Sequence, residues 1–160
     1  MTRACVLAAV VLALAATDAH AVNCGAATTS VAFGSYDVFS AANVDSTGTI
    51  LVNCAKDASD PNGNVSVSYE VKLGPGSSSN LTQRAMQSGS NTLNYNLYVN
   101  TARTQLWGNG VDASSVSDTF TLTNGNPTRN RLHTVFGRIP PLQDAAVGSY
   151  NDNVLVTVQY

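Results

Sequence analysis

The stretch NVSVSYEVKL, residues 64–73, is the clearest indication of the fold. Apolar and polar side chains alternate along the whole stretch, as in a β-strand that buries one face and exposes the other. The apolar row is Val65, Val67, Tyr69, Val71 and Leu73, and the polar row is Ser66, Ser68, Glu70 and Lys72. A helix needs apolar positions three and four residues apart, so the stretch predicts a half-buried strand.

Shorter alternating runs lie on both sides of this stretch. They predict strands at residues 29–33, 49–54, 93–99, 118–123, 131–136 and 153–160. Turn-forming sequences separate them, such as Gly74-Pro75-Gly76 and Asn124-Gly125-Asn126-Pro127. About seven antiparallel strands without helical periodicity predict an all-β, immunoglobulin-like sandwich.

The first 21 residues have the pattern of a cleaved signal peptide. Arg3 supplies a positive charge, residues 6–16 are apolar, and Ala19-His20-Ala21 fits the small-x-small rule for cleavage. The apolar run is shorter than the roughly 20 residues of a membrane-spanning helix, and no later run is long enough either. We therefore expect an exported protein with no membrane span and one domain over residues 22–160.

Cleavage would leave two of the three cysteines, Cys24 and Cys54. In an exported domain this pair predicts one disulfide, and two unpaired buried thiols are the alternative. A metal site is not expected, because two sulfurs and His133 do not supply the usual four ligands.

Charge and motifs argue against several classes of function. The chain has 8 Lys and Arg against 10 Asp and Glu, a formal net charge of −2, which does not favour nucleic acid or an anionic membrane as a partner. His133 lies among alternating strand residues, where packing is the simpler role. The sequence has no Gly-x-Ser-x-Gly elbow, His-rich metal motif or phosphate loop. We expect no catalytic residue and no cofactor, and predict a protein that is not an enzyme.

A series of short motifs resembles the spore coat protein U family, which includes the subunits of archaic chaperone-usher pili. The motifs are Cys24, Phe33-Gly34-Ser35-Tyr36-Asp37, Gly48-Thr49-Ile50-Leu51-Val52-Asn53-Cys54, Arg84-Ala85-Met86, Leu93-Asn94-Tyr95-Asn96-Leu97-Tyr98, Ala102-Arg103, Trp107-Gly108, Phe136-Gly137-Arg138-Ile139-Pro140, and Gly148-Ser149-Tyr150-Asn151-Asp152 followed by Val156-Thr157-Val158-Gln159-Tyr160.

The resemblance implies an incomplete sandwich that lacks its final strand and keeps an apolar groove beside the last one. It also implies the partners of such a subunit: a periplasmic chaperone that fills the groove first, an outer-membrane usher, and another pilin subunit that lends a strand in the fibre. The protein would then be a structural subunit of a pilus or surface coat, secreted or held at the cell surface after passage through the periplasm.

The last predicted strand, residues 153–160, alternates up to Tyr160. Its β-branched row is expected to line the groove, and this row is Val154, Val156, Val158 and Tyr160. The opposite row, Leu155, Thr157 and Gln159, is the alternative. By analogy with chaperone-usher systems, basic residues of the chaperone would hold the α-carboxylate of Tyr160.

Four further expectations follow from the sequence. Only Val22 and Asn23 would precede Cys24 after cleavage, which predicts a subunit that accepts a strand but does not lend one. A secreted lectin-like adhesin or coat protein, which binds surfaces or carbohydrate through residues 74–79 or 109–117, is the alternative function. The side chain of Arg138 is expected to bind carbonyl groups or Asp37, and Trp107 is expected in the core rather than on a sugar-binding platform.

Overall fold

The computed structural model describes residues 22–57 and 63–160. The predicted signal peptide, residues 1–21, therefore lies outside the described residues. The described strands are β1 (Val22–Thr29), β2 (Val44–Lys56), β3 (Asn64–Leu73), β4 (Arg84–Ser88), β5 (Asn91–Tyr98), β6 (Val116–Thr123), β7 (Thr128–Ile139) and β8 (Val156–Gln159), and a short 3₁₀ turn, η1 (Gly76–Ser78), follows β3.

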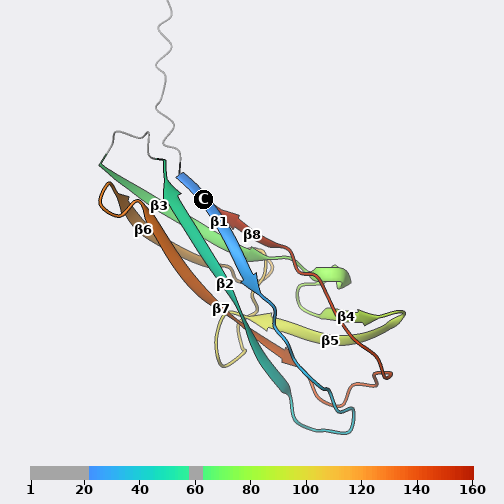
Figure 1. Ribbon diagram of the computed structural model, residues 1–160. Helices are drawn as coiled ribbons and strands as arrows, with labels where there is room; N and C mark the ends of the chain where they lie inside the picture. The colour runs from blue at the N-terminus through green and yellow to red at the C-terminus, as the bar shows by residue number, and fades with distance from the viewer. Residues whose placement is uncertain (1–21, 58–62) are drawn as a thin grey trace, which may run out of the picture.

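These strands form two antiparallel sheets packed face to face (Figure 1). The larger sheet has the order β1-β2-β7-β5-β4, and the smaller one has the order β6-β3-β8. The longest ladder joins β2 to β7, and the strand predicted at residues 64–73 pairs with β6 along one edge and β8 along the other. The predicted all-β sandwich is confirmed.

The core lies between the sheets and contains the rows that the alternation predicts. Along β3, Val67, Tyr69, Val71 and Leu73 are buried, whereas Ser66 and Ser68 are exposed. The opposing sheet contributes Ile50, Val52 and Cys54 of β2. Burial of such side chains stabilises a fold by about 1.5 to 3 kcal/mol each.

The prediction of a first strand at residues 29–33 is wrong, since β1 ends at Thr29. Beyond that point the chain leaves the sheet edge, and Val31 and Phe33 pack onto glycines of the neighbouring strands. A Cβ on Gly137 would lie 2.5 Å from Val31 Cγ1 and 2.7 Å from Phe33 Cζ, and a Cβ on Gly48 would lie 2.7 Å from the carbonyl oxygen of Thr29. The two glycines leave the space that these side chains occupy.

The other predicted strands are present with bounds that differ by at most five residues; one strand was missed, and one begins three residues later. Strand β4 was not predicted, because Arg84, Ala85 and Met86 are all buried and so show no alternation. Strand β8 begins at Val156 rather than at residue 153, because its ladder with β3 ends at the pair Leu73 and Val156.

His133 lies between the two sheets, as a packing residue. Its Nε2 atom is 2.7 Å from the hydroxyl of Tyr69. Its ring packs edge to face against the rings of Tyr69 and Trp107, with 5.8 and 6.5 Å between ring centroids. Burial lowers the pKa of His133, although the nearby carboxylate of Asp118 acts in the opposite direction. The neutral imidazole is therefore the form that the fold favours.

The lowered pKa predicts a loss of stability in mild acid. The unfolded chain takes up a proton at His133 near pH 6.5, before the folded chain does, so this contribution is complete above pH 6.5 and is lost as the pH falls toward the folded pKa. Urea unfolding at about pH 8 and about pH 5.5 should show a lower midpoint at the acid pH, with a smaller difference in His133→Gln. An equal difference in both proteins would assign the acid sensitivity to other groups.

Candidate functional site: an open groove between two sheet edges

Two strand edges lie unpaired on the same side of the sandwich. Within residues 22–57 and 63–160, β1 pairs only with β2, and β8 pairs only with β3. Figure 1 shows β1 and β8 next to each other, and some of their Cα atoms lie within 8 Å of one another, yet no ladder joins them. Each edge therefore leaves backbone groups available to a further strand.

The inward side of β1 is not covered. Ala26 and Thr28 stand opposite Val52 and Ile50 in the ladder, on the same face of the sheet as the Cys24–Cys54 pair. Val52 and Ile50 are 0% and 2% exposed, whereas Ala26 and Thr28 are exposed to solvent. The inward side chains of β2 are therefore shielded from solvent, whereas Ala26 and Thr28 on the inward face of β1 are not.

The last strand presents its valine row to this opening. Val154, Val156 and Val158 are half-buried and pack against the core, whereas Leu155 is 72% exposed and Thr157 and Gln159 are also exposed. Tyr160 lies beyond the end of β8 and is 58% exposed. Val154 and Val156 line the opening described next, and neither Val158 nor Tyr160 does.

A groove follows this opening in two connected sections. The first has a volume of about 580 Å³ and lies between the end of β1, at Thr28 and Thr29, and the segment 150–156. The second, of about 850 Å³, continues between the segments 31–39 and 145–150. The sections share four lining residues, namely Val31, Phe33, Met86 and Tyr150, so they form one continuous groove.

Asp152 lines one wall of the groove and links this wall to neighbouring segments by hydrogen bonds. Its Oδ1 atom accepts hydrogen bonds from the backbone N and Oγ of Ser77 at 2.8 and 2.7 Å and from the backbone N of Asn153 at 2.8 Å. Its Oδ2 atom accepts one from the Tyr95 hydroxyl at 2.7 Å. Burial opposes the ionisation of Asp152, but these hydrogen bonds outweigh it and lower the pKa of the carboxyl group. The same burial, together with the bond to Asp152, raises the pKa of Tyr95.

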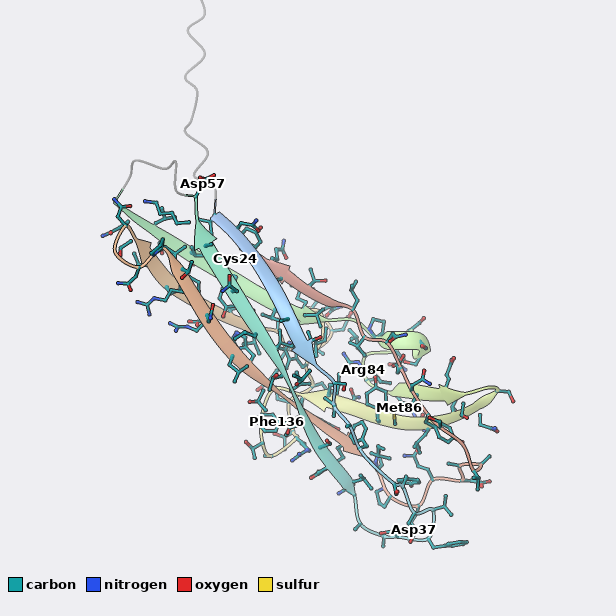
Figure 2. The ribbon with its side chains drawn as sticks, viewed as in Figure 1. Cys24, Asp37, Asp57, Arg84, Met86 and Phe136 are labelled. Atoms are coloured by element: carbon teal, nitrogen blue, oxygen red, sulfur yellow. A yellow bond between two sulfur atoms is a disulfide. The ribbon has the colours of Figure 1, made fainter. Side chains whose placement is uncertain are left out.

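A buried arginine, Arg84, lies next to the groove and binds three segments around it. Arg84 is 0% exposed and its guanidinium donates to the carbonyl oxygens of Gly74 and Trp107 and to Oδ1 of Asn96, at distances of 2.7 to 3.0 Å. These acceptors belong to the β3–β4 connection, the β5–β6 connection and β5, respectively. Figure 2 shows Arg84 next to Met86, one of the four residues that line both sections of the groove. The sequence marked Arg84 only as part of a motif.

The predicted disulfide is present and joins Cys24 of β1 to Cys54 of β2. The two residues face each other in the ladder, and Cys54 is fully buried. The bond therefore attaches the edge strand, whose inward residues Ala26 and Thr28 are exposed, to the interior of the larger sheet.

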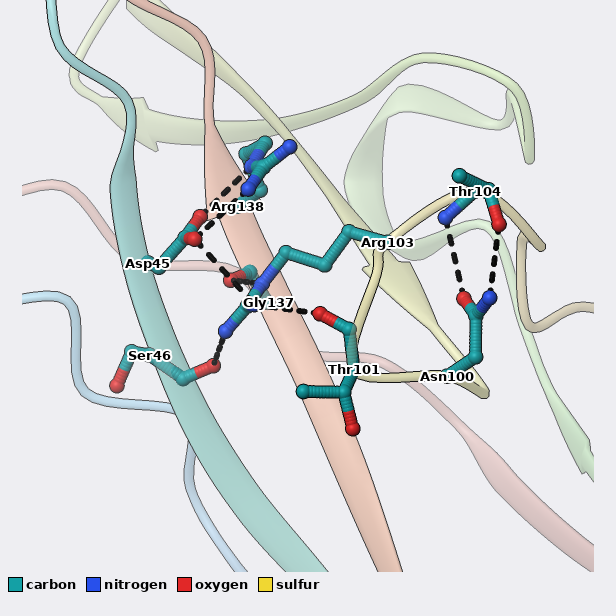
Figure 3. Close-up of polar contacts among 8 residues, drawn as sticks. All are labelled: Asp45, Ser46, Asn100, Thr101, Arg103, Thr104, Gly137 and Arg138. Atoms are coloured by element: carbon teal, nitrogen blue, oxygen red, sulfur yellow. Dashed lines mark hydrogen bonds and ion pairs between the residues drawn. The ribbon is translucent and has the colours of Figure 1, made fainter.

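A second charged cluster lies away from the groove (Figure 3). Arg138 donates to both carboxylate oxygens of Asp45, at 2.7 and 2.8 Å, and Arg103 lies 3.3 Å from the same carboxylate. Arg103 also donates to the carbonyl oxygen of Gly137 at 3.0 Å. The hydrogen bond from Arg138 and the nearby charge of Arg103 lower the pKa of Asp45. The predicted pairing of Arg138 with Asp37 is wrong, because the β2–β7 register sets Asp45 opposite Arg138.

Trp107 is a core residue, as expected. It is 1% exposed, and its indole N–H donates to the carbonyl oxygen of Val71 at 3.0 Å. A sugar ring cannot stack on a side chain that is covered on both faces.

Two negative findings apply to the described part of the chain. Its residues contain no group of three or more His, Cys, Asp or Glu placed to hold a metal ion. None of its helices has the length and apolar character needed to cross a membrane.

The fold and the groove define a class: a two-sheet antiparallel sandwich in which two neighbouring edge strands, β1 and β8, are not paired with each other. The Spore Coat Protein U domain model matches residues 10–157, and the chain belongs to this family. The resemblance seen in the sequence motifs is thereby confirmed. A comparison with curated proteins gave no match.

A solved structure shares the fold. It is the CsuC-CsuE chaperone-tip adhesion subunit pre-assembly complex from archaic chaperone-usher Csu pili of Acinetobacter baumannii. The matched chain is 24% identical, with a TM-score of 0.51, and the alignment covers 87% of the present chain and 40% of that chain. The present chain therefore spans less than half of the length of its structural relative. The likeness confirms the predicted incomplete immunoglobulin-like sandwich.

Proposed function

We propose that this protein is a non-enzymatic structural subunit of a chaperone-usher-type pilus or surface coat, and that it accepts a donor strand between β1 and β8. The observation that carries the proposal is the exposed inward face of β1, where Ala26 and Thr28 stand beside a sealed core. A strand added there would cover this row and the half-buried valines of β8 together, and would bind backbone groups on either edge. Family membership and the chaperone–subunit complex with the same fold support this role.

The size of the vacancy explains why such a subunit would depend on partners. If about four inward side chains of a donor strand each contribute roughly 1.5 to 3 kcal/mol, the missing strand is worth about 6 to 12 kcal/mol. This is similar to the whole stability of a typical domain. The partners in the proposal are a periplasmic chaperone, an outer-membrane usher and other subunits, and the protein would reach the cell surface through the periplasm.

The residues of the last segment that line the groove in this proposal are Val154 and Val156, whereas Val158, farther along β8, packs against the core outside the groove lining. Tyr160 is 58% exposed and lies outside the groove lining. The strand β1 is committed to the subunit's own sheet, since every residue from Val22 to Thr29 pairs with β2. The described residues therefore support an acceptor role.

A bulky charge in the groove tests the proposal. Thr28 lines the groove, whereas its neighbour Ala27 is exposed on the opposite face of β1. We expect co-expression with a chaperone of the chaperone-usher type to raise the periplasmic yield of the wild-type protein several-fold. Thr28→Arg should abolish this gain and the co-purification of chaperone, because the guanidinium would enter the apolar path of the donor strand. The matched control, Ala27→Arg, should retain both.

Two results would contradict the acceptor role. One is abundant, stable monomer without any partner. The other is an equal response of Thr28→Arg and Ala27→Arg to the chaperone, since only Thr28 faces the groove.

A further inference from the structure

We propose that Asp152 makes the groove selective for the charge of the donor strand. The wall that Asp152 forms favours a donor with Lys or Arg at the inward position facing it, and disfavours one with Asp or Glu there. This inference rests on the proposed acceptor role and adds the chemistry of the strand that is accepted.

The charged residues of the groove all have one sign. Among its described lining residues, those that carry charge at neutral pH are Asp152 in the first section and Asp37 in the second. No Lys, Arg or His lines either section in the described part of the chain. The other lining residues are apolar or carry hydroxyl and amide groups, so a donor side chain meets negative charge at two places only.

The carboxylate of Asp152 is held in the wall. Hydrogen bonds from Ser77, Asn153 and Tyr95 reach both of its oxygens. Gly76 closes over it, since a Cβ at that position would lie 2.0 Å from Oδ2. The side chain cannot turn away from an incoming strand without losing these bonds, so its charge stays in one place.

Two charged or titratable side chains lie near Asp152, and neither presents a cation to the groove. Arg84 is fully buried, and its guanidinium is occupied by Gly74, Trp107 and Asn96. It offsets part of the carboxylate's charge from behind but is not a lining residue. Tyr95 is a neutral hydrogen-bond donor with a raised pKa. Among the described lining residues of the first section, the charge nearest to a donor side chain is therefore that of Asp152, and Coulomb attraction favours a cation over an anion beside it.

The test uses peptides that differ in charge at one position. The probes are fluorescein-labelled peptides of about 12 residues, long enough to span the groove as a strand, with inward valines alternating with serine and asparagine. One inward valine is replaced by Lys, Met, Asn or Asp, and the replacement is moved along the peptide because its register in the groove is free. The purified protein is refolded from urea with each peptide, and affinity is measured by fluorescence anisotropy at low and high salt.

We expect one register at which Lys binds about fivefold more tightly than Met, and Asp about fivefold more weakly than Asn, with smaller differences at high salt. In Asp152→Asn both differences should disappear. In Asp144→Asn, which changes an exposed acid outside the groove lining, they should remain.

The other outcomes separate this inference from the acceptor role. Peptides that bind at every register with no preference between Lys and Met, or between Asn and Asp, would overturn the role of Asp152 and leave the strand acceptor standing. Preferences that persist unchanged in Asp152→Asn would also overturn it. Failure of every alternating peptide to bind would instead contradict the acceptor role itself. The comparison of peptides on the wild-type protein does not depend on the folding of any variant.

Discussion

Arg84→Ala should cost about 3 to 5 kcal/mol of the free energy of unfolding, one of the two largest effects that we expect in this protein, together with loss of the disulfide. The substitution removes the four hydrogen bonds that the guanidinium donates to Gly74, Trp107 and Asn96. It leaves their buried oxygens without donors and a cavity behind the groove floor, and each orphaned acceptor costs roughly 1 to 3 kcal/mol. Urea unfolding followed by far-UV circular dichroism measures the loss.

Two variants separate the geometry of Arg84 from its charge. Arg84→Lys keeps a cation but lacks the planar fork that reaches three acceptors at once, so it should recover less than half of the loss. Arg129→Ala, which removes an exposed arginine of β7, should change the unfolding free energy by no more than about 0.5 kcal/mol. Equal stabilities of Arg84→Ala and Arg129→Ala would show that the hydrogen bonds of Arg84 do not stabilise the protein.

Cys24→Ala should cost about 3.5 kcal/mol, the value of the chain-entropy model for a disulfide that closes a loop of 30 residues. The effect should be concentrated on β1, because its inward residues Ala26 and Thr28 are exposed and contribute little burial of their own. In Cys24→Ala, the hydrogen-exchange rates of the β1 amides should therefore increase more than those of the β2 amides. The urea midpoint, measured on the same variant, gives the loss of overall stability.

The two cysteines give different variants. Cys54 is fully buried and Cys24 is not, so Cys54→Ala should lose about 1 kcal/mol more than Cys24→Ala through the cavity that it leaves. Reduction of the wild-type protein with dithiothreitol should reproduce the Cys24→Ala midpoint. A reduced protein as stable as the oxidised one would contradict the stabilising role of the bond.

The sequence predicted best where burial is local and periodic. In β3 each residue alternates between core and solvent, so its bounds and both of its rows could be read from ten residues. The sequence did not predict β4. The burial of Arg84 in this strand depends on oxygen acceptors that come from three separate segments of the chain. No local pattern distinguishes such an arginine from one at the surface.

Charge pairing shows the same limit. The sequence suggested Asp37 as the acidic partner of Arg138, but the register of β2 against β7 places Asp45 opposite Arg138 instead. The hydrogen bonds of Asp152 depend likewise on tertiary structure, because their donors Ser77 and Tyr95 belong to η1 and β5.

The sequence by itself determined the fold class, the cysteine pair and the family motifs, since alternation, cysteine number and motif order are properties of the chain read along its length. Only the tertiary structure decided where the sandwich stays open, because an open edge depends on which strands find neighbours. Thr28 at the end of β1, Met86 of β4 and the segment that carries Asp152, Val154 and Val156 come from separate parts of the chain, and they line one groove only after the two sheets pack.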